Sequence, residues 1–324
     1  MKRILIVYNP RSSKCLRIRK EVIEPLQKIG GYQVGKFEIK SAPTDKNIMA
    51  LERVLLDDDL VVAAGGDGTA TVAMNAIMNS GKDATLGVLG YGNFNDFARM
   101  LKEKDCVQLI SDYESGAVCR LFPIEAVLDG KHWRYAACYF TVGMFAESTE
   151  IFDKPNTRGK LKKGKKGLFF SILTLASWYF RNRKKVFLPV DIQFDDVPMN
   201  KMKIGKSGRV NNILAKPRKR VSDVMFVNGK TVAKVMRGGD YCLGPEKFLV
   251  CVGRSRCFLR LCGFMIQSIF LRLPGKIKNN AKIDFSGPEE FEIQAEGEYA
   301  RVRAKELVVK KDNNGLEVVY RLEN

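Results

Sequence analysis

The stretch DLVVAAGGDGT at residues 59–69 places a glycine-rich turn between a buried apolar run and the expected start of a helix. Phosphate binding needs this geometry, because the backbone N–H groups stand clear of side chains and the helix dipole points at the anion. Asp67 would repel a bare phosphate, so its presence predicts a bridging Mg²⁺ or a proton-transfer role. An ordinary glycine turn is the alternative. The strand context and the aspartate favour a phosphate site, since α/β sheets bind ligands at the carboxyl ends of their strands.

A second turn of this kind follows in GVLGYGNFNDFAR at residues 87–99, again directly after an apolar run. Two such turns at the ends of neighbouring strands would face one crevice. Asp96 would then be a second carboxylate near the phosphates. Alternatively, it caps the helix that is expected to begin at Phe97.

Outward from these turns, apolar runs alternate with helical patterns, which predicts a parallel sheet. The expected strands are 4–8, 32–39, 60–64 and 85–89, and the expected helices are 16–29, 45–56 and 69–79. After Pro123 the runs become β-rich, at residues 124–128, 133–142, 186–194, 221–227, 248–252 and 291–294.

We therefore predict an α/β protein of two domains. Residues 1–122 would form a three-layer, parallel-sheet nucleotide-binding domain, with residues 310–324 as a candidate to complete it. Residues 123–309 would form a mostly antiparallel, β-sandwich-like domain. A length of 324 residues suits two domains, each with its own core.

The formal net charge of +19 predicts attraction to polyanions, although a basic proteome explains it equally well. Nucleic acid ranks last among such partners, because no recognition helix or aromatic-interleaved basic sheet is visible. The eight cysteines form no C-x-x-C pair, and the single histidine, His132, is expected in a hairpin turn after Asp129-Gly130. A zinc site or a Ser/His triad therefore has nothing to build on. The apolar run at residues 4–8 is too short for a signal segment, so we expect reduced cysteines in a cytoplasmic protein.

Two apolar stretches with basic flanks are candidates for contact with an anionic membrane. Residues 168–180 follow the lysine-rich run 160–166 and are too few to span a bilayer; a packed core helix is the favoured reading. Residues 254–276 are amphipathic and basic, and the two alternatives for them are membrane contact and a plain surface helix. Residues 201–220 are expected to form a solvated basic loop.

Three motifs together resemble the bacterial diacylglycerol kinase and sphingosine kinase-like lipid kinases: GGDGT at 65–69, NDFAR at 95–99 and NPRSS at 9–13. GGDGT alone is shared with NAD kinases and phosphofructokinases, and NDFAR points to the lipid branch. The resemblance continues through VGMFA at 142–146 and ends at EGE, residues 296–298, where the family has Asp-Gly-Glu.

The resemblance implies an ATP- and Mg²⁺-dependent kinase that phosphorylates diacylglycerol or a related lipid at the inner face of the cell membrane. Glu298 matches the family's general base, and Asp67 and Asp96 would hold Mg²⁺ on the phosphates. From the residues alone, the turn at Glu298 reads equally as an ordinary acidic turn. The predicted nucleotide-binding residues are Asn9, Pro10, Ser12, Ser13, Ser41, Gly65, Gly66, Gly68, Thr69, Gly92, Asn93 and Asn95.

Several family positions are changed. Thr71-Val72 replace an Asn-Glu pair, Gly92-Asn93-Phe94 replace Gly-Thr-Gly, and residues 244–250 lack the acidic ligands of a structural Mg²⁺. These changes leave two alternatives open: a catalytically weakened member that binds nucleotide or lipid, and an NAD kinase-like phosphotransferase. A homodimer is also left open.

Overall fold

The computed structural model describes residues 2–102, 105–153, 188–194, 219–234, 236–253 and 270–321, together with residues 177, 180–181, 263–264 and 266–268. The lysine-rich run 160–166, most of the segments 168–180 and 201–220, and residues 254–262, 265 and 269 of the segment 254–276 lie outside the described residues. Within the described part, no helix is both long and apolar enough to cross a membrane.

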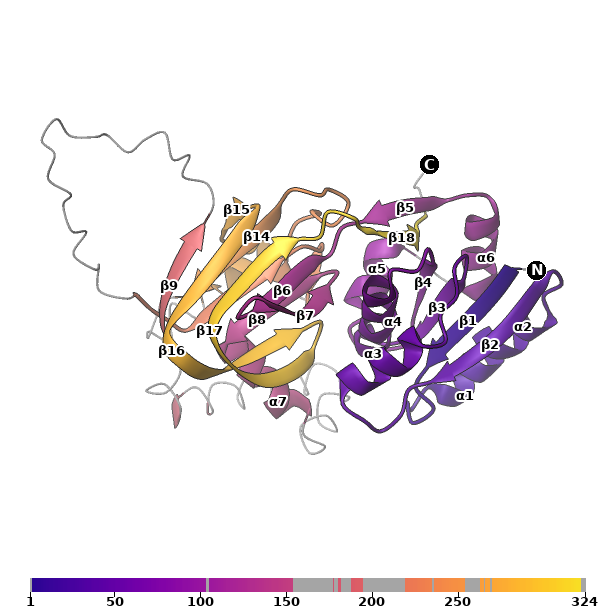
Figure 1. Cartoon of the computed structure of the whole chain (residues 1–324), viewed down its shortest axis with the longest axis horizontal. Coiled ribbons are helices and arrows are strands. Elements are labelled where there is room, and N and C mark those ends of the chain that lie inside the picture. The colour runs from indigo at the N-terminus through magenta and orange to yellow at the C-terminus, as the bar shows by residue number, and fades with distance from the viewer. Residues whose placement is uncertain are drawn as a thin grey trace, which may run out of the picture.

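The described residues form two main sheets that lie side by side (Figure 1). The first sheet has the strand order β2-β1-β3-β4-β18-β5, and all neighbouring pairs are parallel except β18 with β5. Its strands are β1 (Lys2–Tyr8), β2 (Tyr32–Glu38), β3 (Leu60–Gly65), β4 (Thr85–Gly90), β5 (Val118–Leu121) and β18 (Leu316–Val319). All six residues of β3 are buried, as expected of a parallel strand covered on both faces.

Helices cover both faces of this sheet, because alternate residues of each strand point to opposite sides. Ile4 and Ile6 of β1 share a core with Ile18, whereas Leu5 shares a second core with Leu51. The helical elements are α1 (Cys15–Ile18), a π-helical turn η1 (Arg19–Ile23), α2 (Glu24–Lys28), α3 (Thr44–Glu52), α4 (Asp67–Ser80), α5 (Asp96–Leu101) and α6 (Cys106–Glu114). The first domain therefore has the three layers that the sequence predicts.

The second sheet is antiparallel and follows the order β15-β14-β11-β8-β16-β17-β6-β7, with β9 attached to β16 and β10 to β9. The helix α7 (Met144–Asp153) follows β8, and β12 (Thr231–Val232) and β13 (Met236–Arg237) form a separate hairpin. The strands of the sheet are β6 (Ile124–Leu128), β7 (Lys131–Ala136), β8 (Tyr139–Gly143), β9 (Leu188–Phe194), β10 (Lys219–Val221), β11 (Asp223–Val227), β14 (Phe248–Gly253), β15 (Lys276–Lys278), β16 (Asn280–Ala295) and β17 (Glu298–Lys311).

Three local expectations differ from the structure. The run 133–142 is two strands, β7 and β8, and the run 291–294 is only the end of the long β16. His132 is the second residue of β7, two positions beyond the turn, and its Nδ1 is 2.8 Å from Glu125 Oε1. Apolar content marks strands well, but it does not show where one strand turns into the next.

The chain passes between the two sheets twice, at residues 122–123 and 311–312. The Asp312 N–H donates to the Pro123 carbonyl at 3.0 Å, so the two crossings lie against each other. Between them, buried Lys311 donates from Nζ to the carbonyls of Phe122 and Tyr241. The return crossing leads into β18, which occupies the first sheet between β4 and β5. The exact domain boundaries stay a prediction.

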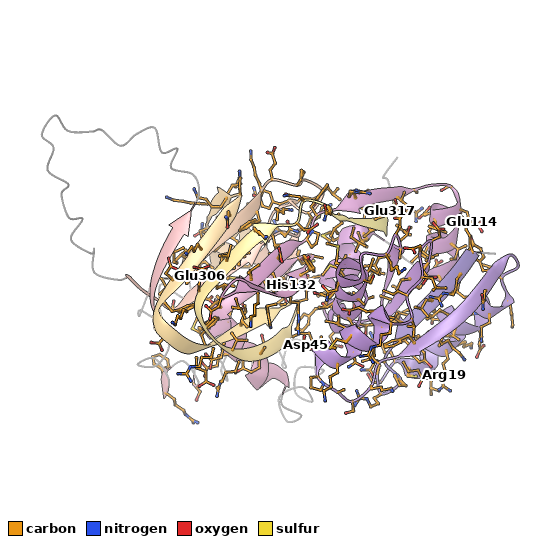
Figure 2. All side chains as sticks on the ribbon, viewed as in Figure 1. Arg19, Asp45, Glu114, His132, Glu306 and Glu317 are labelled. Atoms are coloured by element: carbon orange, nitrogen blue, oxygen red, sulfur yellow. The ribbon has the colours of Figure 1, made fainter. Side chains whose placement is uncertain are left out.

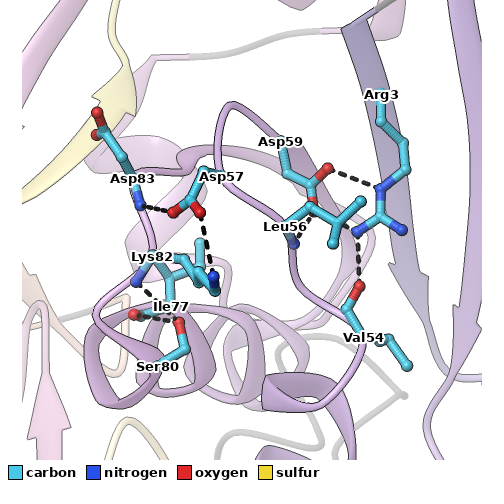
Figure 3. A network of polar contacts seen from close by, with 9 residues as sticks. All are labelled: Arg3, Val54, Leu56, Asp57, Asp59, Ile77, Ser80, Lys82 and Asp83. Atoms are coloured by element: carbon cyan, nitrogen blue, oxygen red, sulfur yellow. Dashed lines mark hydrogen bonds and ion pairs between the residues drawn. The ribbon is translucent and has the colours of Figure 1, made fainter.

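Polar contacts hold the amino ends of the first sheet's strands (Figure 3). Arg3 Nε donates to Asp59 Oδ1 at 2.7 Å, and Asp59 Oδ2 accepts the Leu56 N–H at 2.8 Å. Lys82 Nζ pairs with Asp57 Oδ2 at 3.1 Å, which ties the loop before β3 to the loop before β4. The opposite, carboxyl edge of the sheet carries the loops of the predicted site.

Candidate functional site

The GGDGT turn has the form that the sequence predicts. β3 ends at Gly65, Gly66 is the N-cap, and the 14-residue helix α4 begins at Asp67. The Gly66 carbonyl accepts the N–H groups of Thr69 and Ala70 at 3.0 and 3.2 Å. A Cβ on Gly65 would collide with the Thr69 side chain, so the turn requires glycine at this position.

The turn after β4 packs directly on the GGDGT turn. The Tyr91 N–H donates to the Gly65 carbonyl at 2.6 Å, and a Cβ on Gly92 would lie 2.5 Å from Gly66 Cα. Asn95, at φ 55°, closes this turn by accepting the Gly92 N–H on Oδ1 at 2.7 Å. The backbones of two loops that are some 25 residues apart in sequence are thus in direct contact.

The loop between β1 and α1 joins this pair. Lys14 Nζ donates to the Gly92 carbonyl at 3.1 Å, and Asn9 shapes its own loop by accepting the Ser12 N–H at 3.1 Å. Three loops at the carboxyl ends of β1, β3 and β4 therefore meet. They contain the predicted residues Asn9, Pro10, Ser12, Ser13, Gly65, Gly66, Gly68, Thr69, Gly92, Asn93 and Asn95, while Ser41 lies in the loop before α3.

Asp67 is partly buried at the first turn of α4. Its Oδ1 accepts the Phe97 N–H at 3.1 Å. Burial, with a smaller contribution from the negative charge of Asp96, raises the pKa of Asp67 to about 6, although hydrogen bonds from the backbone of Phe97 and Asn95 oppose the rise. Asp67 and Asp96 are therefore close enough to influence each other.

Asp96 is 2% exposed and is held by residues of both domains. Arg99 and Thr231 donate to its Oδ1, and the Lys234 N–H lies 3.1 Å from both carboxylate oxygens. Thr231 and Lys234 belong to the β12–β13 hairpin of the second domain, and Lys234 has a φ of 66°. Asp96 thus joins the NDFAR turn to that hairpin by hydrogen bonds.

A magnesium ion fits this site only in part. Mg²⁺ in kinases is usually held by one or two carboxylates together with the substrate's phosphates, and Asp67 at the phosphate turn suits that role. Asp96 would have to release several hydrogen bonds to bind a cation directly. In the described ranges, no group of three histidine, cysteine or acidic side chains is placed to hold a metal. The metal role of both residues stays a prediction.

Glu298 reaches the GGDGT turn from the second domain. It follows the two-residue turn Glu296-Gly297, in which both φ angles are positive (50° and 85°), as in the tight turns of β-hairpins. A Cβ on Gly68 would collide with Glu298 Oε1, so the carboxylate lies directly over the Gly68 backbone. Its other oxygen, Oε2, accepts a hydrogen bond from Thr44 Oγ1 at 3.0 Å. The structure thus brings the predicted base to the predicted phosphate turn.

Glu296 turns inward and is 3% exposed. Its Oε1 accepts the N–H groups of Cys138 and Tyr139, whereas its buried Oε2 has no hydrogen-bond partner. Burial, with smaller contributions from the charges of Asp67 and Asp96, raises the pKa of Glu296 to about 8, although the hydrogen bonds from the backbone of Cys138 and Tyr139 oppose the rise. The side chain therefore carries a proton at neutral pH.

Sequence reasoning missed four residues that shape this site: Lys14, Thr44, Thr231 and Lys234. Lys14 directly follows the NPRSS motif, so its position was a usable signal. The other three lie outside every motif. Their contacts join residues 135 to 254 positions apart, which sequence patterns do not reveal.

We predict that Gly92→Ala lowers the free energy of unfolding by about 1–3 kcal/mol, the usual cost of overpacking. The added Cβ would meet the Gly66 backbone, which cannot rotate away as a side chain can. Urea unfolding measures the change. Gly30→Ala is the matched control, because a Cβ at Gly30 would have nothing within 4 Å. Equal stability of the two variants would contradict the close approach of the loops.

We also predict that Glu296→Gln flattens the dependence of stability on pH. Folding raises the pKa of Glu296 from its ordinary 4.5 to about 8, so the folded protein keeps a proton that the unfolded chain loses in this window. Stability is then full below about pH 4.5 and declines as pH rises towards 8, by up to about 1.4 kcal/mol per pH unit. Glutamine mimics the protonated acid and removes this decline.

Urea unfolding at pH 5.5 and 7.5 tests this, with Glu290→Gln on the exposed part of β16 as control. The difference in unfolding free energy between the two pH values should shrink in Glu296→Gln alone. An unchanged difference would mean that Glu296 is ionised in the folded protein.

Comparison with known proteins supports the family resemblance. The diacylglycerol kinase catalytic domain family matches residues 3–119. The diacylglycerol kinase of Bacillus subtilis (strain 168) is 39% identical over 103 residues, and that of Staphylococcus epidermidis is 37% identical over 102 residues. Each alignment covers 31% of this chain, and the chain spans about a third of the length of these relatives.

Solved structures match over nearly the whole chain. A diacylglycerol kinase structure from Bacillus anthracis has a TM-score of 0.66 at 17% identity and covers 99% of this chain and 97% of its own. An NAD kinase from Archaeoglobus fulgidus, in complex with ATP, has a TM-score of 0.51 at 12% identity, with 98% and 93% covered. The resemblance expected from the motifs is therefore confirmed over residues 3–119, and the chain has the two-domain α/β fold of these kinase structures.

Proposed function

We propose that this protein is an ATP-dependent kinase that transfers the γ-phosphate to a hydroxyl of diacylglycerol or a related lipid. The observation that carries the proposal is the position of Glu298, a carboxylate of the second domain that lies over Gly68 in the phosphate turn of the first. A base placed there can act only on an acceptor bound between the two domains, beside the nucleotide's phosphates. The names of the relatives support a lipid as that acceptor.

The nucleotide would bind across the three loops at the carboxyl edge of the first sheet. The start of α4 offers free backbone N–H groups and the positive end of a 14-residue helix, which suit phosphates. Asp67 would hold Mg²⁺, which neutralises charge on the phosphates when bound. Asp96 would contact the same Mg²⁺ through a water molecule, or directly once its hydrogen bonds to Thr231 and Lys234 are broken.

In the transfer step, the oxygen of the lipid hydroxyl attacks the γ-phosphorus as the bond to the bridging oxygen of ADP breaks. The hydroxyl proton moves to Glu298, which must be ionised beforehand. Burial raises the pKa of nearby Glu296 to about 8, so Glu296 adds no second negative charge beside Glu298 at neutral pH.

The catalytically weakened member of the fold remains the second candidate. Phe94 is 49% exposed in the turn that faces the phosphates, where the resembling family has a small residue, and Asp96 is tied up by the β12–β13 hairpin. Such a protein would bind nucleotide without turnover. An NAD kinase-like activity is a third outcome that the same assay reads.

We expect the protein to transfer label from Mg·[γ-³²P]ATP to diacylglycerol in mixed micelles, and Glu298→Gln to lower kcat by about 10²–10⁴-fold with little change in ATP affinity. Asp67→Ala should abolish transfer. Glu290→Gln, an exposed change on the neighbouring strand, should leave turnover unchanged. Parallel reactions contain NAD⁺ as the acceptor.

Full turnover by Glu298→Gln would remove the proposed base. Label in NAD⁺ alone would assign the chain to the NAD kinase-like reaction. ATP binding without label in either acceptor would support the weakened member.

We further propose that the protein acts at the cytoplasmic face of an anionic membrane and docks through the second domain. Ile266, Phe270 and Leu271 are 59%, 69% and 72% exposed, although all three are large and apolar. Leu273 beside them is buried, and Arg272 donates to the Gly238 carbonyl at 2.9 Å, so this end of the segment is anchored. Apolar side chains on a basic protein suit a negatively charged bilayer surface.

We expect the protein to sediment with vesicles rich in phosphatidylglycerol but not with neutral phosphatidylcholine vesicles, and binding should weaken as salt rises. The double change Phe270→Ser with Leu271→Ser should reduce sedimentation several-fold. Leu56→Ser, at a 53% exposed leucine of the first domain, is the control. Binding that ignores lipid charge, or that survives the double change, would contradict this docking surface.

A further inference from the structure

Thr44 contacts the carboxylate that the proposed reaction uses as its base. It is the first residue of α3, in the first domain, and its Oγ1 donates to Oε2 of Glu298 at 3.0 Å, across 254 positions of sequence. Thr44 belongs to none of the motifs that identify the nucleotide site.

The turn that carries Thr44 is internally fixed. Asn47 is 4% exposed, and its Oδ1 accepts the Lys40 N–H at 2.8 Å while its Nδ2 donates to the carbonyls of Lys40 and Ala42. The Lys46 N–H donates to the Pro43 carbonyl at 3.0 Å. A hydroxyl on such a turn has a defined position, and the β-branched threonine has few rotamers to lose.

The same turn also grips the second domain through the next residue. Asp45 forms an ion pair with Arg134 of β7, whose side chain is 4% exposed. Figure 2 labels Asp45 at the seam between the two sheets. The start of α3 therefore makes two adjacent contacts with the second domain, one to a structural arginine and one to Glu298.

The two oxygens of Glu298 have different surroundings. Oε2 receives the Thr44 hydroxyl, whereas Oε1 lies over the backbone of Gly68. A carboxylate without the first contact is free to rotate about its terminal bond and to leave the phosphate turn. With the contact in place, one oxygen is engaged and the other is presented to the space beside the phosphates.

We propose that Thr44 is a positioning residue, whose hydroxyl holds Glu298 in the orientation that removes the acceptor's proton. The inference rests on the proposed kinase reaction and names a further residue for it. The competing explanation is that the hydrogen bond of Thr44 only stabilises the packing of one domain on the other. In that case, loss of the hydroxyl would change stability but not the chemical step.

The test compares Thr44→Val, which keeps the shape and removes the hydroxyl, with Thr44→Ser, which keeps the hydroxyl. We expect Thr44→Val to lower kcat by about 10- to 100-fold with KM for ATP unchanged, since misplacement of a catalytic group by about 1 Å has effects of that size. Thr44→Ser should recover most of the loss. In the Glu298→Gln background, Thr44→Val should cause no further loss, because the two residues act as one unit.

Thr85→Val is the matched control. Thr85 Oγ1 donates to Oε1 of Glu317 at 2.7 Å, so this variant loses an equivalent threonine–glutamate hydrogen bond at the amino end of β4, away from the site. Glu317 is labelled in Figure 2. Turnover by this variant, measured below its unfolding temperature, should equal that of the unaltered protein.

Each outcome separates this inference from the proposed function. Unaltered kcat in Thr44→Val, beside a strongly impaired Glu298→Gln, would overturn the role of Thr44 and leave the kinase reaction standing. Equal losses of kcat in Thr44→Val and Thr44→Ser, or additive losses with Glu298→Gln, would also overturn the positioning role of the hydroxyl. If the unaltered protein transfers no label to lipid, the proposed function fails, and the positioning role fails with it.

Discussion

The contact between the backbones of Gly66 and Gly92 is the constraint on which the site depends. It sets the turn after β4 against the turn after β3, with no space for a side chain between them. The parallel pairing of β3 with β4 makes this contact available, because it brings both carboxyl ends to one edge. The Phe97 N–H then reaches Asp67, and the NDFAR turn is placed where Asp96 meets the second domain. Separation of the two glycines would disturb each of these contacts together.

Four carboxyl groups lie close to this contact, and they differ in burial and in hydrogen-bond partners. Asp96 accepts hydrogen bonds from Arg99, Thr231 and the Lys234 backbone, whereas Glu296 is buried and its pKa is raised to about 8. Asp67 lies between these extremes, with its pKa raised to about 6, so a cation beside it would favour its charged form. Glu298 keeps access to the phosphate turn. Distinct environments for neighbouring acids are how one site can hold a metal ligand and a base together.

How well the sequence predicts each part of the site depends on how far apart in the sequence the contacting residues lie. The strand, turn and helix around GGDGT are encoded within about twenty residues, so apolar runs and glycines predicted them closely. That Glu298 belongs to the site was expected only through the family resemblance, and its position over Gly68 was not expected, since nothing local links residues 230 apart. The contacts of Thr44 and Thr231 were not expected at all, because they arise from the docking of one domain on the other. The assigned roles of the site residues stay predictions.

The departures from the resembling family do not all weigh equally on activity. Val72 stands where the family has a carboxylate, yet it is 3% exposed and packs in the core between α4 and the sheet. An apolar residue is what this position requires here, so Val72 is evidence about packing rather than about lost chemistry. Phe94 is different, because it is half-exposed in the turn that would face the nucleotide and no packing need explains it. An aromatic face there can stack on a flat ring or shield the phosphates from water, and either role favours nucleotide binding. The case for a weakened enzyme therefore depends on Phe94 and on the hydrogen bonds that tie Asp96 to the β12–β13 hairpin, while Glu298 keeps its position over Gly68.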